Sequence, residues 1–266
     1  KTHEQKSVYQ PFFLTMSFFA THAEDGKIPS YRPKNETRLG TYPDWPLSPQ
    51  VPVPKTATEL HYQQLPRFLI GEGNNEGRMR WRNRFEPHNF QNSIKDMYSM
   101  ATEVDTAVGA VMQQIKQMDD DVYNNTVFIF TTDNGTYVVD VYRDDKPERL
   151  TTLADVSRAQ CIVSLSLSLS LFLCAVTVTC FVLSFYLSTS LSLSSITVLL
   201  GNMHGEHGLA EKWYPFEESI RVPLVIQDPR MPEHRKGTRN DAWTLNVDLP
   251  TTILGVANIP PAPFMQ

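Results

Sequence analysis

The sequence predicts an α/β protein in which an incomplete, mostly parallel sheet is flanked by helices and interrupted by a hydrophobic insertion. An apolar run at 11–20 has the composition of a buried strand, a second apolar run at 127–130 predicts another strand, and an amphipathic helix precedes this second run. Helix, short turn, strand and loop, in that order, are typical of parallel α/β sheets. A long stretch at 159–203 contains no charged residue and marks the insertion.

The predicted elements follow one another along the chain. Residues 11–20, PFFLTMSFFA, predict a buried strand that ends in a polar turn containing His22. Residues 29–66 are rich in proline, lack any period and predict a long surface excursion. After the insertion, 221–227 predicts a strand, and 241–257 predicts a strand or turn that leads into a short helix.

Residues 92–118 carry the strongest helix signal. Apolar side chains recur there at alternating spacings of three and four, which places them on one face of a helix. These side chains are Ile94, Met97, Ala101, Val104, Val108, Val111, Ile115 and Met118. Asn92 or Ser93 is expected to cap the start of the helix. The apolar run VFIF at 127–130 then predicts a strand that follows the helix after a short turn.

The loop TTDNG after this strand contains candidate metal ligands. Asp133 and Asn134 stand at the C-terminal end of a predicted parallel strand, where α/β sheets place their ligands. A carboxylate and an amide oxygen are the kind of hard donors that bind Ca²⁺ or Mg²⁺. On the tripeptide alone, however, Asp-Asn-Gly favours a simple turn.

The composition limits the partners. The chain has 266 residues and a formal net charge of -5, whereas a nucleic-acid-binding protein is expected to present a basic surface, so no nucleic-acid partner is predicted. All cysteines lie inside the uncharged stretch, and the rest of the chain therefore offers no disulfide framework. The sequence begins on a polar stretch at Lys1 without a signal peptide, which we interpret as a start within a domain.

Several blocks of sequence occur in an order shared with one enzyme family. They are FIFTTDNG, HGEHGLAEKWYPFEESIRVPLVIQDPR and LNVDLPTTILGVANIPPAP. These blocks resemble the type I sulfatases of the alkaline-phosphatase superfamily closely over 127–135 and 201–266, and more loosely over 11–25 and 92–118. The resemblance implies the α/β fold of that superfamily and hydrolysis of a sulfated small molecule or carbohydrate. It also implies a protein of the secretory pathway, extracellular or lysosome-like.

The resemblance assigns roles to individual residues. Asp133 and Asn134 match metal ligands, with Ca²⁺ as the expected ion and Mg²⁺ as the alternative. Lys212 resembles the lysine that contacts the sulfate, where a positive charge stabilises the transition state. His22 resembles the histidine that hydrogen-bonds the ester or sulfate oxygen and can transfer a proton. The position of His207 beside the pocket implies a further substrate contact.

Other parts of the family pattern are missing. The family's nucleophile is a cysteine converted to formylglycine in a C-x-[P/A]-x-R motif, and Cys161, Cys174 and Cys180 do not stand in such a motif. The chain is therefore expected to carry about half of a sulfatase site and to be inactive by itself. Two alternatives remain open: a phosphoester or phosphonate hydrolase of the same superfamily, and a non-catalytic, membrane-associated fragment. The HGEH run at 204–207 could suggest zinc, but its glycines and loop spacing disfavour it.

The insertion separates two parts of one pattern. Removing 136–201 joins FIFTTDNG to NMHGEHGL, and we interpret this segment as a translated intron between two parts of a sulfatase catalytic domain, 1–135 and 202–266. Its alternating Ser and Leu are what a CT-dinucleotide repeat encodes, as in the pyrimidine tract before a 3′ splice site. The rival interpretation is a transmembrane helix near 171–187, with membrane contact only through 160–200. The period-2 alternation also suits an extended β segment.

Overall fold

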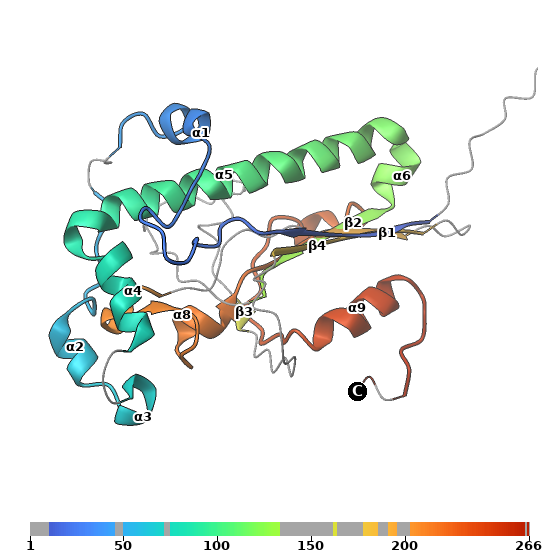
Figure 1. Ribbon diagram of the computed structural model, residues 1–266. Coiled ribbons are helices and arrows are strands. Elements are labelled where there is room, and N and C mark those ends of the chain that lie inside the picture. The colour runs from blue at the N-terminus through green and yellow to red at the C-terminus, as the bar shows by residue number, and fades with distance from the viewer. Residues whose placement is uncertain are drawn as a thin grey trace, which may run out of the picture.

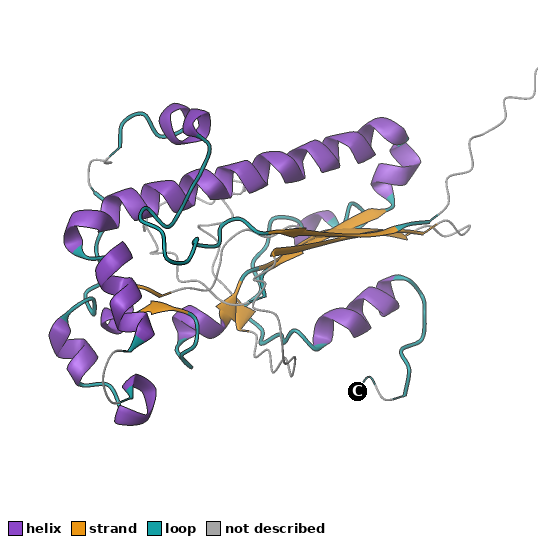
Figure 2. Cartoon of the chain, viewed as in Figure 1, coloured by secondary structure: helices purple, strands orange, loops and turns teal. Residues whose placement is uncertain are grey.

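A sheet with helices on both of its faces forms the centre of the protein (Figure 1). The computed structural model describes residues 11–45, 50–71, 75–133, 162–163, 178–185, 191–195, 203–263 and 265. The long helix α5 lies over one face of the sheet, and helix α9 covers part of the other face. A group of short helices and turns lies beyond one end of the sheet (Figure 2).

The described helices and strands have the following bounds. The α-helices are α1 (Asn35–Gly40), α2 (Glu59–Gln63), α3 (Arg67–Ile70), α4 (Glu76–Arg84), α5 (Pro87–Met118), α6 (Asp120–Asn124), α8 (Glu217–Ile220) and α9 (Asp248–Val256). Short 3-10 turns are η1 (Glu206–Gly208) and η2 (Glu233–Arg235). The strands are β1 (Phe13–Phe18), β2 (Thr126–Thr131), β3 (Ile162–Val163), β4 (Val178–Phe185), β5 (Leu191–Ser195), β6 (Met203–His204), β7 (Ala210–Glu211), β8 (Arg221–Val222) and β9 (Leu224–Gln227).

The central sheet has the strand order β1-β4-β2-β5-β9. Strand β4 pairs antiparallel with both β1 and β2, and its position 183 stands opposite both Phe13 and Val127. Strands β1 and β2 consequently run parallel to each other, on either side of β4. Among the described strands, however, only β2 and β5 form a parallel pairing, and β9 is antiparallel to β2. The predicted mostly parallel pairing is thus not confirmed, because a strand from the inserted segment lies between β1 and β2.

Helix α5 confirms the helix predicted at 92–118, although it begins earlier, at Pro87. Proline suits the first helical turn, because its φ is preset and its missing N–H would have no partner there. The predicted caps were wrong. Glu86 precedes the first turn, and Ser93 lies inside the helix, where its hydroxyl donates to the Arg84 carbonyl at 2.6 Å. The predicted apolar stripe is buried at Ile94, Met97, Val104, Val108 and Ile115.

Strand β2 confirms the strand predicted at 127–130, and all its residues are buried. Successive side chains of a strand point to opposite faces of a sheet. Phe128 and Phe130 pack into the cluster under α5, whereas Val127 and Ile129 pack with apolar residues of α9. Burial on both faces thus fixes the strand, and Asp133 stands two residues after its end at Thr131.

Strand β1 confirms the strand predicted within 11–20, but the prediction that it is buried was wrong. It forms an edge of the central sheet as described, and only one of its faces is covered. Met16 and Phe18 pack against the cluster under α5, while Phe13 is 53% exposed. The strand ends next to the turn that contains His22.

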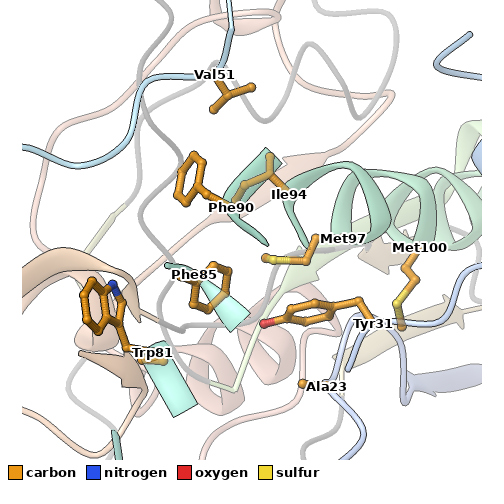
Figure 3. Packing of buried hydrophobic residues seen from close by; sticks show 10 residues of the cluster. Ala23, Tyr31, Val51, Trp81, Phe85, Phe90, Ile94, Met97 and Met100 are labelled. Atoms are coloured by element: carbon orange, nitrogen blue, oxygen red, sulfur yellow. The ribbon is translucent and has the colours of Figure 1, made fainter. Parts of the chain in front are cut away.

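A second core lies where the start of α5 meets α4 and the N-terminal loops (Figure 3). Phe85 and Phe90 are almost fully buried there, with their ring centroids 6.4 Å apart. Tyr31 and Val51 are also buried, so the predicted surface excursion at 29–66 contributes anchors to the core. Burial of a large apolar side chain stabilises a fold by about 1.5–3 kcal/mol, and these anchors hold the segment that follows His22.

The inserted segment forms strands wherever the structure describes it. Residues 178–185, inside the candidate transmembrane span at 171–187, form strand β4 and not a helix. The alternating Ser and Leu residues at 191–195 form strand β5. No helix in the described ranges is long and apolar enough to cross a membrane. The remainder of 136–201 lies outside the described residues, and its interpretation as a translated intron stays a prediction.

Candidate functional site

His22 lies in the turn after β1, close to the charge of Lys212. Its backbone N–H donates to the Phe19 carbonyl at 3.0 Å, and the two rings lie 5.2 Å apart. Burial lowers the pKa of the His22 imidazole, and the positive charge of Lys212 lowers it further. A backbone contact and the carboxylates of Glu211 and Asp25 act in the opposite direction. The net effect favours a neutral imidazole beside a cation at neutral pH.

Lys212 follows a short hairpin made by β6 and β7, in which Met203 pairs with Glu211 and His204 pairs with Ala210. The side chain of Lys212 is half-buried, and the chain turns sharply just before it, because Glu211 has a φ of 83°. The charge of Lys212 therefore acts on His22 although the two predicted site residues lie far apart in the sequence, and Arg80 joins their neighbours Glu211 and Asp25 at 2.7 and 2.8 Å.

Two arginines of helix α4 connect the segments that carry this pair. Arg84 and Arg80 both donate to the Glu211 carboxylate, Arg80 at 2.7 Å. Both also donate to Asp25, at 3.1 and 2.8 Å respectively. The side chains of Arg84 and Glu211 are 5% and 4% exposed, so this ion pair is shielded from solvent.

A third arginine of α4 holds the turn between β6 and β7. The Arg78 guanidinium lies over the rings of Tyr62 and Trp81, 4.7 and 4.0 Å from their centroids. It also donates to the Gly208 carbonyl at 2.8 Å and forms an ion pair with Glu59. Gly208 has a φ of 68°, and a Cβ there would lie 2.5 Å from Arg78 Nη1, so the turn requires glycine.

His207 is anchored to its own surroundings. Its ring stacks on Phe216 with the centroids 4.3 Å apart, and its Nε2 lies 3.9 Å from a carboxylate oxygen of Glu218. Its backbone N–H donates to the Thr56 hydroxyl at 3.1 Å. These contacts account for the position of the ring, and a role for His207 in substrate binding stays a prediction.

Glu206 is a buried carboxyl group in the same turn. Burial raises the pKa of Glu206 to about 7. The hydrogen bond that its carboxylate accepts from the His204 backbone N–H acts in the opposite direction and lowers this pKa. The His204 ring lies 5.3 Å from that of Phe85, inside the protein. Within the described ranges no three His, Cys, Asp or Glu side chains gather as metal ligands.

Asp133 lies two residues after the end of β2, and Asn134 lies outside the described residues. Asp133 borders a cavity of about 490 Å³ that apolar side chains of α9 also line, among them Leu249 and Ile253. Ca²⁺ usually takes about six to eight oxygen ligands. Asp133 alone does not supply them, and its place in a metal site stays a prediction.

The sequence interpretation missed the arginines of α4. Their signal was present in the run RMRWRNR, because Arg80 and Arg84 stand four residues apart and thus on one face of a helix. Their acidic partners could not be found from spacing, since Asp25 and Glu211 lie far away in the sequence and meet the arginines only in the fold.

Helices on both faces of a sheet, with the charges of Lys212, Glu211 and Asp25 acting on His22 after β1, define an α/β protein with a polar site beyond a strand end. A sequence model of the family described as Sulfatase matches residues 2–259, and the chain belongs to that family. The family has an alkaline-phosphatase-like α/β fold, consists of hydrolases and is generally metal-dependent. A comparison with curated proteins gave no match.

Proposed function

We propose that the chain is part of the catalytic domain of a sulfuric ester hydrolase that acts on a sulfated small molecule or carbohydrate. The observation that carries the proposal is that the charge of Lys212 acts on His22, whose neighbouring segment is tied to that of Lys212 by Arg80 and Arg84, in a member of the sulfatase family. An ammonium group suits the oxygens of a sulfate ester, and a half-buried position strengthens this attraction relative to water.

The two side chains have complementary tasks in this proposal. Lys212 binds the sulfate group through its ammonium group. His22, whose pKa is lowered by burial and by Lys212, is neutral at pH 7 and can donate a hydrogen bond to an ester oxygen. When sulfate arrives, its negative charge favours the imidazolium form, so the same histidine can take up a proton. No cysteine of the sequence stands in a C-x-[P/A]-x-R motif, and we propose that the chain alone does not turn over an ester.

Calorimetric titration of the protein with inorganic sulfate tests the proposal. Lys212→Met is expected to weaken sulfate binding about tenfold or more, because a hydrogen bond to a charged group contributes roughly 1.5–3 kcal/mol. Lys236→Met is the matched control, since Lys236 is exposed and pairs only locally with Glu233 at 3.0 Å. Equal affinities of Lys212→Met and wild type would contradict the proposal. Tighter binding of phosphate than of sulfate would favour a phosphoester hydrolase.

The metal and the compartment complete the proposal. Asp133, together with Asn134, is proposed to contribute oxygen ligands to a Ca²⁺ site, with Mg²⁺ as the alternative ion. Further oxygen ligands are needed to complete such a site. The proposed compartment is the secretory pathway, and microscopy of the tagged protein in its native cell tests it. Recovery of the protein in an alkaline carbonate wash would argue against a membrane anchor at 160–200.

A further inference from the structure

A chain of buried and half-buried ion pairs joins the segments of the two proposed site residues. Arg84 and Arg80 extend from α4 and each contacts both Glu211 and Asp25. Glu211 directly precedes Lys212, and Asp25 stands three residues after His22. Arg84 also donates from Nε to the Ser30 hydroxyl at 3.2 Å, in the loop that follows His22.

We propose that Arg84, Arg80, Glu211 and Asp25 form a positioning network that holds Lys212 beside His22. The inference rests on the proposed function, because it concerns the same pair. These four residues need not touch the substrate. They act through the two segments that they tie to one helix.

The backbone of Glu211 supports this role. A φ of 83° is unfavourable for a residue with a side chain, and such a conformation persists only where the surroundings impose it. The two guanidinium groups supply that constraint by anchoring a carboxylate that is 4% exposed. This conformation turns the chain immediately before Lys212, and the anchor of Glu211 therefore sets the direction in which Lys212 leaves the hairpin.

The network also sets the charge around His22. The charged groups that act on its imidazole are Lys212, which lowers its pKa, and Glu211 and Asp25, which raise it. Replacing Glu211 by glutamine has two opposite effects on this pKa. It removes a negative charge, and it also lets Lys212 move if the network positions it. A single substitution cannot separate the two effects.

A double-mutant cycle separates them. The pKa of His22 is measured by NMR in the wild type and in Lys212→Met, and the same comparison is made in the Glu211→Gln background. Lys212→Met is expected to raise the pKa of His22 in the wild type, because a nearby cation is lost. In the Glu211→Gln background the rise should be much smaller. A rise of the same size in both backgrounds would overturn the positioning network.

The same comparison of Lys212→Met with its parent is made in two further variants, one as a control and one in case Glu211→Gln does not fold. Glu76→Gln removes an exposed partner of Arg80 without touching Glu211, and there the full rise is expected. Asp25→Asn replaces an exposed member of the network and serves if Glu211→Gln does not fold; the rise should again be reduced. If Glu76→Gln reduces the increase in the pKa of His22 as much as Glu211→Gln does, the proposal is also overturned. If Lys212→Met leaves the pKa of His22 unchanged in the wild type, the observation behind the proposed function itself fails.

Discussion

Arg78 donates a hydrogen bond from Nη1 to the carbonyl of Gly208 at 2.8 Å and thereby joins helix α4 to the turn between β6 and β7. Arg78, Arg80 and Arg84 lie on one short helix, and each contacts the region around this hairpin. Helix α4 is therefore the support on which the segment of Lys212 rests.

Replacing Arg78 by methionine should destabilise the protein by about 2–4 kcal/mol, because it removes a buried hydrogen bond and the contacts with two aromatic rings. Urea unfolding measures the change. Arg82→Met is the matched control on the same helix. The side chain of Arg82 is 55% exposed, and its Nη2 lies 3.8 Å from Oε2 of Glu59. If Arg82→Met lowers the free energy of unfolding as much as Arg78→Met does, Arg78 does not have the stabilising role assigned to it.

Alanine at Gly208 should destabilise the protein more than alanine at Gly237. Both glycines have a positive φ, of 68° and 64°, so the backbone strain of the two substitutions is similar. Only at position 208 would the new Cβ lie 2.5 Å from Arg78 Nη1 and 2.9 Å from the Thr58 carbonyl oxygen. The difference between the two melting temperatures isolates this collision, and equal losses would contradict it.

The sequence predicts the elements whose pattern lies within one segment, and it does not predict contacts between segments that are distant in the sequence. Helix α5 and strand β2 could be predicted, because an apolar stripe and an apolar run carry their own burial pattern. The pairing of β4 with both β1 and β2 could not, since strand partners distant in sequence leave no local pattern. The proximity of His22 and Lys212 was expected from family resemblance alone. The arginine contacts that connect their segments required the fold.

The buried carboxyl of Glu206 should make stability depend on pH. Its pKa is raised from 4.5 to about 7 in the folded protein, so the folded state holds the proton more tightly than the unfolded state. This contribution is full below pH 4.5 and is lost as the pH rises through 7, by roughly 3 kcal/mol in all.

Urea unfolding of the wild type and Glu206→Gln at pH 5 and pH 8 measures this dependence. The variant should lose less stability than the wild type between the two pH values, because glutamine does not ionise. Glu233→Gln is the control, since the side chain of Glu233 is 87% exposed, and it should follow the wild type. A wild-type pH dependence preserved in Glu206→Gln would contradict the account.

Asp133→Asn should weaken binding of Ca²⁺, because it replaces a charged oxygen donor at the end of β2 by a neutral one. Calorimetric titration of the protein with Ca²⁺, and separately with Mg²⁺, gives the affinities. Asp241→Asn provides a control at an exposed carboxylate that pairs with Arg239. Unchanged Ca²⁺ binding in Asp133→Asn would remove this residue from the proposed metal site.

The interpretation of 136–201 as a translated intron has its own test. Sequencing of transcripts from the native cell should find messages in which the codon of Gly135 is followed by that of Asn202. If the mature message encodes the Ser-Leu repeat throughout, the segment belongs to the protein. Strand β4 is then a genuine member of the central sheet.

The central claim is that Lys212 and His22 together receive a sulfate group. The most direct measurement is an NMR pH titration of the His22 imidazole in the presence of sodium sulfate and of sodium chloride at equal ionic strength. A bound sulfate should raise the pKa of His22, because its negative charge favours the imidazolium form and offsets the effect of Lys212. The account predicts a higher pKa in sulfate than in chloride, and a much smaller difference in Lys212→Met. Identical pKa values of His22 in the two salts would contradict it.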